Sequence, residues 1–227
     1  MALNGVKKEP LLIAGNGKLS YSIAVCLLQS GFPVTLYTEN KYDAEENIAA
    51  HFAGLNRYTT QLPEKNRLEI THKLHSALSC QLAIVVTGED VLHKKSLIRE
   101  LEKKLPAGSV IAVNTESIPL RILQEGVKHP ERVIGLNWTE PAHTTYFMEV
   151  ITNAKNDVAL AKHLANEAKT YWGKDPYIIS GELGIRAKMM AAMTREAFYL
   201  VENGYASVED IDRACRNDPG YYLPFAG

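Results

Sequence analysis

Two closely spaced glycines near the amino terminus form the first pattern that could do chemistry. The apolar run Leu11–Ala14, typical of a buried strand, leads directly into Gly15, and Gly17 opens a helix-forming segment. This order of strand, glycine turn and helix is the context in which a G-x-G-x-x-G motif binds a dinucleotide. The missing side chain at Gly17 would let backbone N–H groups and the positive end of the helix approach a pyrophosphate. Ser20 replaces the third glycine, a small change that affects mainly helix packing. The predicted cofactor-binding residues of this loop are Gly15, Asn16, Gly17, Lys18 and Leu19.

The end of the second predicted strand bears on the choice of coenzyme. Rossmann domains that bind NAD usually place an acid there, because a carboxylate accepts hydrogen bonds from the ribose hydroxyls. Here Val34–Tyr37 is followed by Thr38, then Glu39, with Lys41 nearby. Glu39 would favour NAD, whereas Thr38 and Lys41 could accommodate the 2′-phosphate of NADP. We expect NAD as the cofactor and leave NADP open, with Asn114 as a further predicted cofactor contact.

Alternating apolar runs and helix-period segments indicate the fold that must position this loop. Such alternation is typical of an α/β protein with a Rossmann-type, mainly parallel sheet. The predicted strands are Leu11–Ala14, Val34–Tyr37, Leu82–Thr87, Val110–Val113, Val133–Leu136, Phe147–Ile151 and Tyr177–Ile179. The predicted helices between them are Lys18–Gln29, Ala44–Gly54, Val91–Leu105, Ile118–Gln124 and Asp157–Trp172.

Beyond about residue 183 the sequence predicts helices alone. Lys188–Glu202 is one long helical run, and Gly204 marks its end. Ser207 is a suitable N-cap for a second helix, which residues 218–220 would close. We therefore predict a dinucleotide-binding domain over residues 1–182 and a short all-helical part over residues 183–227.

Composition narrows the class of partner. The 25 basic and 26 acidic residues leave a net charge of -1, which creates no field that would attract nucleic acid or an anionic membrane. No stretch approaches the roughly 20 apolar residues that span a bilayer, and residues 1–10 lack the apolar core of a signal peptide. His72 and His75 have no evident third metal ligand. We expect a cytoplasmic protein that binds a small-molecule substrate and no metal, nucleic acid or membrane.

Several blocks along the chain resemble the 3-hydroxyacyl-CoA dehydrogenases. They are Pro106–Leu120, Pro130–Trp138 and Phe147–Val150, followed in the tail by Leu200–Ala214 and Gly220–Phe225. The resemblance covers about residues 11–225. It implies hydride transfer between a nicotinamide and a 3-hydroxyacyl or 3-oxoacyl substrate, in the setting of fatty acid metabolism, with an acyl-CoA as one candidate substrate.

The resemblance also assigns candidate catalytic residues. In that family a histidine after Gly-Leu is the general acid/base, a later glutamate orients it, and a serine and an asparagine bind the substrate oxygen. In this chain Asn137 stands at the histidine position, Ala187 at the asparagine position, and Glu116 at the serine position beside Ser117. Glu149 alone matches the family. The predicted catalytic residues are Glu149, Asn137, Glu116 and Ser117, and the resemblance adds Lys94 as a minor candidate for ligand contact.

Replacing the histidine by Asn137 changes the chemistry, because an amide does not titrate near neutral pH and cannot transfer the proton that accompanies a hydride. Glu116 and His143 are candidate replacements. Three hypotheses follow. The first is a dehydrogenase with a different proton donor, and the second is a catalytically inactive relative that acts as a sensor or assembly partner. The third is a reductase closer to other dehydrogenases, with Lys188 as its acid.

Two further departures concern the substrate and the oligomer. The segment between Tyr37 and Leu82 is shorter than the family's helical excursion, which helps hold coenzyme A, so a CoA thioester is a weaker expectation. The chain ends at Gly227, where the family continues with helices that complete its cleft and dimer interface. We expect a homodimer formed through the C-terminal helices, and packing on its own dinucleotide-binding domain is the alternative. The apolar side chains that need a cover are Met189, Met190, Met193, Phe198 and Leu200.

Overall fold

The computed structural model describes residues 8–55, 67–74 and 79–217. The chain divides into two compact units, residues 1–184 and residues 185–227, which are described separately. His75, the expected helix end at 218–220 and the block at 220–225 lie outside the described residues.

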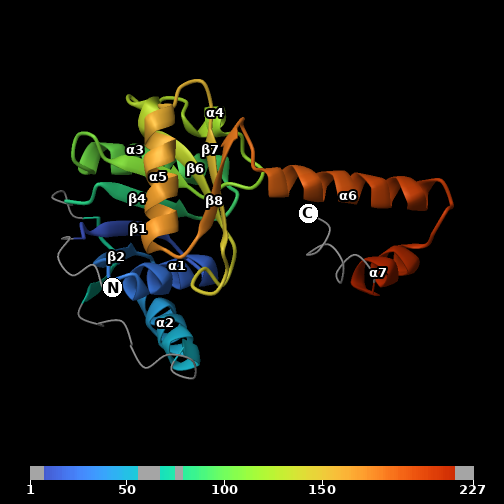
Figure 1. Ribbon diagram of the computed structural model, residues 1–227, viewed down its shortest axis with the longest axis horizontal. Helices are drawn as coiled ribbons and strands as arrows, with labels where there is room; N and C mark the ends of the chain where they lie inside the picture. The colour runs from blue at the N-terminus through green and yellow to red at the C-terminus, as the bar shows by residue number, and fades with distance from the viewer. Residues whose placement is uncertain (1–7, 56–66, 75–78, 218–227) are drawn as a thin grey trace. The chain divides into compact units, whose positions relative to one another are not determined.

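An eight-stranded sheet forms the centre of the first unit (Figure 1), in the order β3-β2-β1-β4-β5-β6-β7-β8. Every neighbouring pair is parallel except β6 and β7, which are antiparallel. The predicted mainly parallel Rossmann-type sheet is confirmed. Its strands are β1 (Leu11–Gly15), β2 (Val34–Tyr37), β3 (Leu68–Thr71), β4 (Leu82–Val86), β5 (Val110–Val113), β6 (Val133–Trp138), β7 (Phe147–Thr152) and β8 (Asp175–Ser180).

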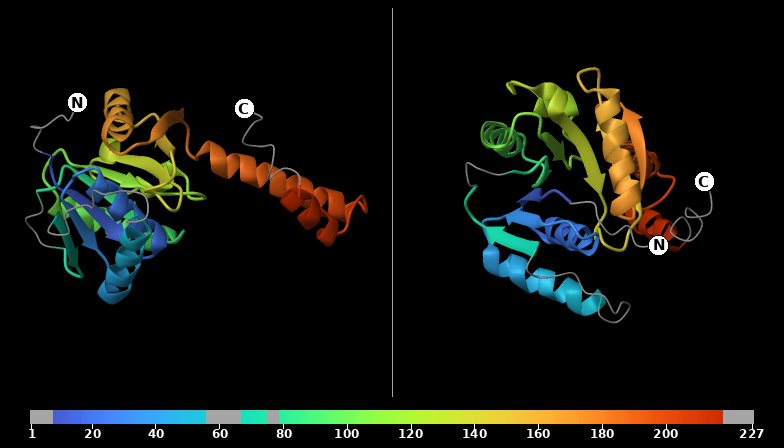
Figure 2. Two further views of the ribbon diagram at one scale, coloured as in Figure 1. Left: turned by 60° about the horizontal axis from the view of Figure 1, so that its bottom comes forward. Right: turned by 60° about the vertical axis from the view of Figure 1, so that its left-hand side comes forward.

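Helices cover both faces of this sheet, which is why its central strands are apolar throughout. On one face lie α1 (Lys18–Gln29), α2 (Lys41–Leu55) and α5 (Val158–Tyr171). On the other lie α3 (Val91–Lys104) and α4 (Leu120–Leu123), as Figure 2 shows, and a short 3₁₀ turn at Pro130–Arg132 precedes β6. Leu11 and Ile13 of β1 enter one hydrophobic cluster and Leu12 and Ala14 the other, so the strand anchors the sheet to both layers.

The edge strand β3 was missed by the sequence analysis. Its residues Leu68–Thr71 pair with β2 in the register Val34↔Leu68, but none of them is fully buried. Leu68 and Ile70 pack in part against the hydrophobic cluster on the α2 face, but four residues with only partial burial leave little pattern to detect.

The second unit contains α6 (Ile185–Glu202) and α7 (Val208–Asn217), which confirms the predicted helical part. Gly204 has a φ of 72°, as a helix-ending glycine requires. The Ser207 hydroxyl accepts a hydrogen bond from the Asp210 N–H at 3.1 Å and so caps α7. None of the helices in the described part of the chain combines the length and apolar character that a membrane crossing requires.

Candidate active site

The glycine loop lies where the strand order reverses beside β1. A crevice at the carboxyl ends of β1 and β4 is the position in which such sheets bind ligands. A Cβ at Gly15 would stand 1.8 Å from the carbonyl oxygen of Val86, so the close approach of β1 to β4 requires glycine. Gly17 has a φ of 104° and opens α1, and a Cβ there would meet no atom within 4 Å. The loop therefore leaves open space over the helix N-terminus, and these residues fit the pyrophosphate of a dinucleotide.

Asn16 connects this loop to the end of β2. Its Oδ1 accepts hydrogen bonds from the Thr38 hydroxyl at 2.5 Å and from the Glu39 N–H at 3.0 Å. Thr38 is buried, whereas the Glu39 side chain is exposed at a hollow that His93, Ser96 and Glu100 of α3 also line. Glu39 is therefore the carboxylate at this strand end that a ribose could reach. Of the other predicted contacts, Lys18 is exposed and Leu19 is half-buried against the core.

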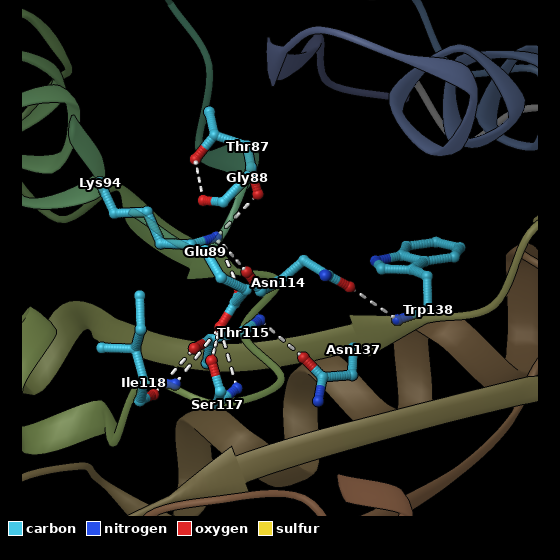
Figure 3. Close-up of polar contacts among 10 residues, drawn as sticks. All are labelled: Thr87, Gly88, Glu89, Lys94, Asn114, Thr115, Ser117, Ile118, Asn137 and Trp138. Carbon is cyan, nitrogen blue, oxygen red and sulfur yellow. Dashed lines mark hydrogen bonds and ion pairs between the residues drawn. The ribbon is translucent and has the colours of Figure 1, made fainter. Parts of the chain in front are cut away.

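Lys94 of α3 crosses to the ends of β4 and β5 (Figure 3). Its Nζ donates to the carbonyl oxygens of Thr87 at 3.0 Å and Asn114 at 2.7 Å, and pairs with Glu89 Oε1 at 3.3 Å. The side chain has no exposed surface. Burial lowers the pKa of the Lys94 ammonium, and the negative charge of Glu89 offsets part of that effect. Lys94 thus connects the two loops that flank the crevice.

Glu89 is the anchor of the loop that follows β5. Its Oε2 accepts hydrogen bonds from the Ser117 N–H at 2.9 Å, the Ser117 hydroxyl at 2.8 Å and the Ile118 N–H at 3.3 Å (Figure 3). Burial acts to raise the pKa of Glu89, but the hydrogen bonds from Ser117 and the charge of Lys94 outweigh it and hold that pKa below its usual range. Ser117, a predicted substrate contact, thus donates to Glu89. Glu116 is half-buried in the same loop, and its charge acts on Lys94.

Asn137 and Glu149 meet across the antiparallel pair of β6 and β7, where they are direct neighbours in register. Asn137 Oδ1 accepts a hydrogen bond from the Thr115 N–H at 2.8 Å, and its Nδ2 donates to Glu149 Oε2 at 3.1 Å. Both side chains have no exposed surface. The Thr115 N–H fixes the orientation of the amide, so Asn137 must present its N–H to the carboxylate. The side chain of Asn114, a predicted cofactor contact, accepts from the Trp138 N–H at 3.1 Å and ties β5 to β6.

Gly184 closes the space beside this pair. A Cβ at residue 184 would lie 1.9 Å from Glu149 Oε2 and 3.1 Å from Asn137 Nδ2. We predict that Gly184→Ala lowers the free energy of unfolding by about 1–3 kcal/mol, because the added methyl group must displace a buried carboxylate. Gly54→Ala is the matched control: a Cβ there meets nothing within 4 Å and alanine favours the helix, so no loss is expected. Urea unfolding of both variants measures the difference, and equal stabilities would contradict the crowding argument.

The structure does not bring His143 to this pair. His143 lies in the β6–β7 loop, and its ring packs edge-on against His51 of α2 with centroids 4.8 Å apart. Leu136 and Trp138 belong to the hydrophobic cluster on the α2 face, so Asn137, which alternates with them along β6, points to the opposite face. Burial lowers the pKa of His143 to about 4, and the charges of His51 and Lys174 act in the same direction.

This histidine should make stability depend on pH. Because the pKa of folded His143 is about 4 and that of an unfolded histidine is about 6.5, only the unfolded chain binds the proton between those values. The His143 contribution is complete above pH ~6.5 and is lost as the pH falls toward 4. We expect the unaltered protein to lose about 1–2 kcal/mol more than His143→Asn between pH 7 and 4.5, after allowance for partial exposure. Urea unfolding at several pH values tests this, and parallel curves would rule it out.

No group of three or more histidine, cysteine or carboxylate side chains is arranged to hold a metal ion within residues 8–55, 67–74 and 79–217.

The fold is that of a known class of dehydrogenase. The family model described as "3-hydroxyacyl-CoA dehydrogenase, NAD binding domain" matches residues 11–182, and the model of the same family's C-terminal domain matches residues 185–227. The chain belongs to the 3-hydroxyacyl-CoA dehydrogenase family, and the first match is its NAD-binding domain. The resemblance and the cofactor predicted from the sequence are thereby confirmed.

Individual relatives are about a quarter identical to this chain over the aligned residues. It is 27% identical over 224 residues to a probable 3-hydroxybutyryl-CoA dehydrogenase of Bacillus subtilis, covering 92% of this chain and 75% of the relative. It is 25% identical over 225 residues to 5-formyl-3-hydroxy-2-methylpyridine 4-carboxylate 5-dehydrogenase of Mesorhizobium japonicum, covering 96% and 72%. The crystal structure of FadB2 of M. tuberculosis is similar with a TM-score of 0.80 at 25% identity, covering 93% of this chain and 78% of that one.

Proposed function

We propose that this chain is an NAD-dependent dehydrogenase that transfers a hydride between the nicotinamide and a small 3-hydroxyacyl or 3-oxoacyl compound. The observation that carries the proposal is that one edge of the sheet holds the glycine loop together with the glutamate that matches the family. The glycine loop ends β1, and the buried Asn137–Glu149 pair lies at the ends of β6 and β7. When bound, NAD supplies or accepts the hydride.

The residues at this edge of the sheet divide between coenzyme binding and substrate binding. The backbone at Gly15 and Gly17 holds the pyrophosphate, and the Glu39 carboxylate accepts hydrogen bonds from the ribose hydroxyls. Lys94 and Glu89 hold the loops after β4 and β5 at the reacting end of the coenzyme. Asn137 donates an N–H to the substrate carbonyl and polarises it, and Glu149 holds the amide in place.

The substrate class follows from relatives of two kinds. The B. subtilis relative is named for a CoA thioester, whereas the M. japonicum relative is named for a pyridine carboxylate. We propose a short 3-oxoacyl compound, with acetoacetyl-CoA as the first probe and the free 3-oxo acid acetoacetate as the second. Glu116 and Ser117 would lie beside the substrate oxygen, as the family resemblance implies.

The first test is consumption of NADH, and separately of NADPH, on adding acetoacetyl-CoA at high protein concentration. Turnover with NADH establishes a dehydrogenase whose proton donor is not a histidine. Activity found only in an Asn137→His variant would mean that the cleft is intact but inactive, which would replace this proposal with the sensor or assembly hypothesis. Replacing Lys188 by Met separates the third hypothesis, because an unchanged rate removes Lys188 as the acid.

We further propose that the predicted helical part, residues 183–227, forms a homodimer through its helices. Met189, Met193 and Phe198 of α6 are 59%, 41% and 64% exposed, a large apolar surface for a protein in water. Sedimentation equilibrium of the unaltered chain and of Phe198→Ser tests this proposal, because a monomer in both would contradict it. The cytoplasmic location stays a prediction, which cell fractionation would test.

A further inference from the structure

Three polar side chains form a row across strands β6, β7 and β8, and β8 is the edge strand of the sheet. The strand register places Asn137 of β6 opposite Glu149 of β7, and Glu149 opposite Tyr177 of β8. The Tyr177 hydroxyl donates to Glu149 Oε1 at 3.0 Å, while Asn137 Nδ2 donates to Glu149 Oε2 at 3.1 Å. Glu149 therefore receives one hydrogen bond from the amide that replaces the family's histidine and one from a phenol.

The members of this row differ in their access to water. Asn137 and Glu149 have no exposed surface, whereas Tyr177 is 37% exposed. The Tyr177 ring packs edge-on against Phe147, with centroids 6.1 Å apart, which fixes the direction of its hydroxyl. The Tyr177 hydroxyl, which can donate and accept a proton at the same time, thus connects the Glu149 carboxylate to the protein surface.

We propose that Glu149 is the proton donor and acceptor of the reaction and that Tyr177 relays protons between Glu149 and solvent, which replaces the missing imidazole. The inference rests on the proposed function. It assigns Glu149 a role beyond orienting its neighbour, because an amide at position 137 can hold the substrate oxygen but cannot supply a proton.

In the reduction, the proton that the substrate oxygen gains comes from water by way of Tyr177 and Glu149. When bound, NADH would supply the hydride for the new C–H bond at the substrate carbonyl carbon, and Glu149 would give its carboxyl proton to the carbonyl oxygen. The Tyr177 hydroxyl proton then passes to Glu149 Oε1 as the phenol oxygen accepts a proton from water, so no free phenolate forms. In the oxidation direction each transfer is reversed.

Tyr177→Phe is the direct test, because it removes the hydroxyl and keeps the ring that packs on Phe147. We expect kcat to fall about 10–100-fold, with the KM for NADH and for acetoacetyl-CoA changed less than about twofold, as loss of a proton-transfer group predicts. The solvent deuterium isotope effect on kcat should rise, and a small acid such as acetic acid should restore part of the rate. Tyr146→Phe, in the exposed loop before β7, is the control and should match the unaltered protein.

The outcomes separate this inference from the proposed function. No turnover by the unaltered chain with either 3-oxo probe would overturn both. Turnover that Tyr177→Phe leaves unchanged would overturn the relay alone. A lower rate in Tyr177→Phe with an unchanged isotope effect and no rescue by acetic acid would also overturn it, because those are the results of a purely structural contact. Glu149→Gln must lose activity more severely than Tyr177→Phe, since it removes the donor itself.

Discussion

Gly15→Ala should lower the affinity for NADH at least about 100-fold and the free energy of unfolding by about 3 kcal/mol or more. The Cβ would stand 1.8 Å from the Val86 carbonyl oxygen, which belongs to backbone and cannot turn aside. Strands β1 and β4 would have to separate where their carboxyl ends form the crevice. Both the fold and the coenzyme site depend on that contact, so one methyl group affects both.

Gly17→Ala separates the two effects. A Cβ at Gly17 meets nothing within 4 Å, but its φ of 104° is unfavourable for alanine, so we expect a loss of only about 1–2 kcal/mol in stability. Its methyl group would nevertheless enter the open space over the N-terminus of α1, and NADH affinity should fall strongly. Fluorescence titration with NADH and urea unfolding provide the two readings. If Gly15→Ala proved as stable as Gly17→Ala, the argument from the β1–β4 contact would be wrong.

The parts of this molecule that depend on local sequence could be predicted. Gly15, Gly17 and the strand before them are continuous in the chain, so their spacing is a sufficient signal. The end of α6 and the start of α7 follow from Gly204 and Ser207 for the same reason, whereas α6 begins at Ile185, three residues before the predicted helical run. The Asn137–Glu149 pair was reached through the family resemblance, because 12 residues separate its members and no periodicity joins them.

The contacts that the sequence analysis missed join segments that only the fold brings together. Glu89 and Ser117 are 28 residues apart, as are Glu149 and Tyr177. Glu89 stands one residue before Asp90, whose side chain caps α3 by accepting from the His93 N–H, so the sequence could suggest a helix start but not the bonds of Glu89 to a distant loop. Tyr177 carried only the signal of a strand residue. The sequence analysis named Asn114 and Ser117 as ligand contacts, the latter through the family resemblance, and in the fold their side chains bond Trp138 and Glu89.

Lys94 offers the second large effect. Lys94→Met should lower the free energy of unfolding by about 2–4 kcal/mol, because it removes a buried ammonium group that donates to two carbonyl oxygens and pairs with the partly exposed Glu89. The Thr87 and Asn114 carbonyl oxygens would lose their donor, and Glu89 would lose the adjacent cation. The pKa of Glu89 should rise as that charge disappears. The loops after β4 and β5 would then loosen beside the crevice, and NADH affinity should fall with stability.

Lys95→Met is the matched control, one residue along the same helix. Lys95 pairs with Glu125 at 2.8 Å, but the Glu125 side chain is 56% exposed, so solvent screens the pair and its loss should change stability little. The double variant Glu89→Gln with Lys94→Met should recover part of the loss, because it removes the unpaired charge while the introduced amide oxygen can still accept from Ser117. Urea unfolding of the four proteins completes the comparison. Equal losses in Lys94→Met and Lys95→Met would show that the contacts of Lys94 do not hold these loops together.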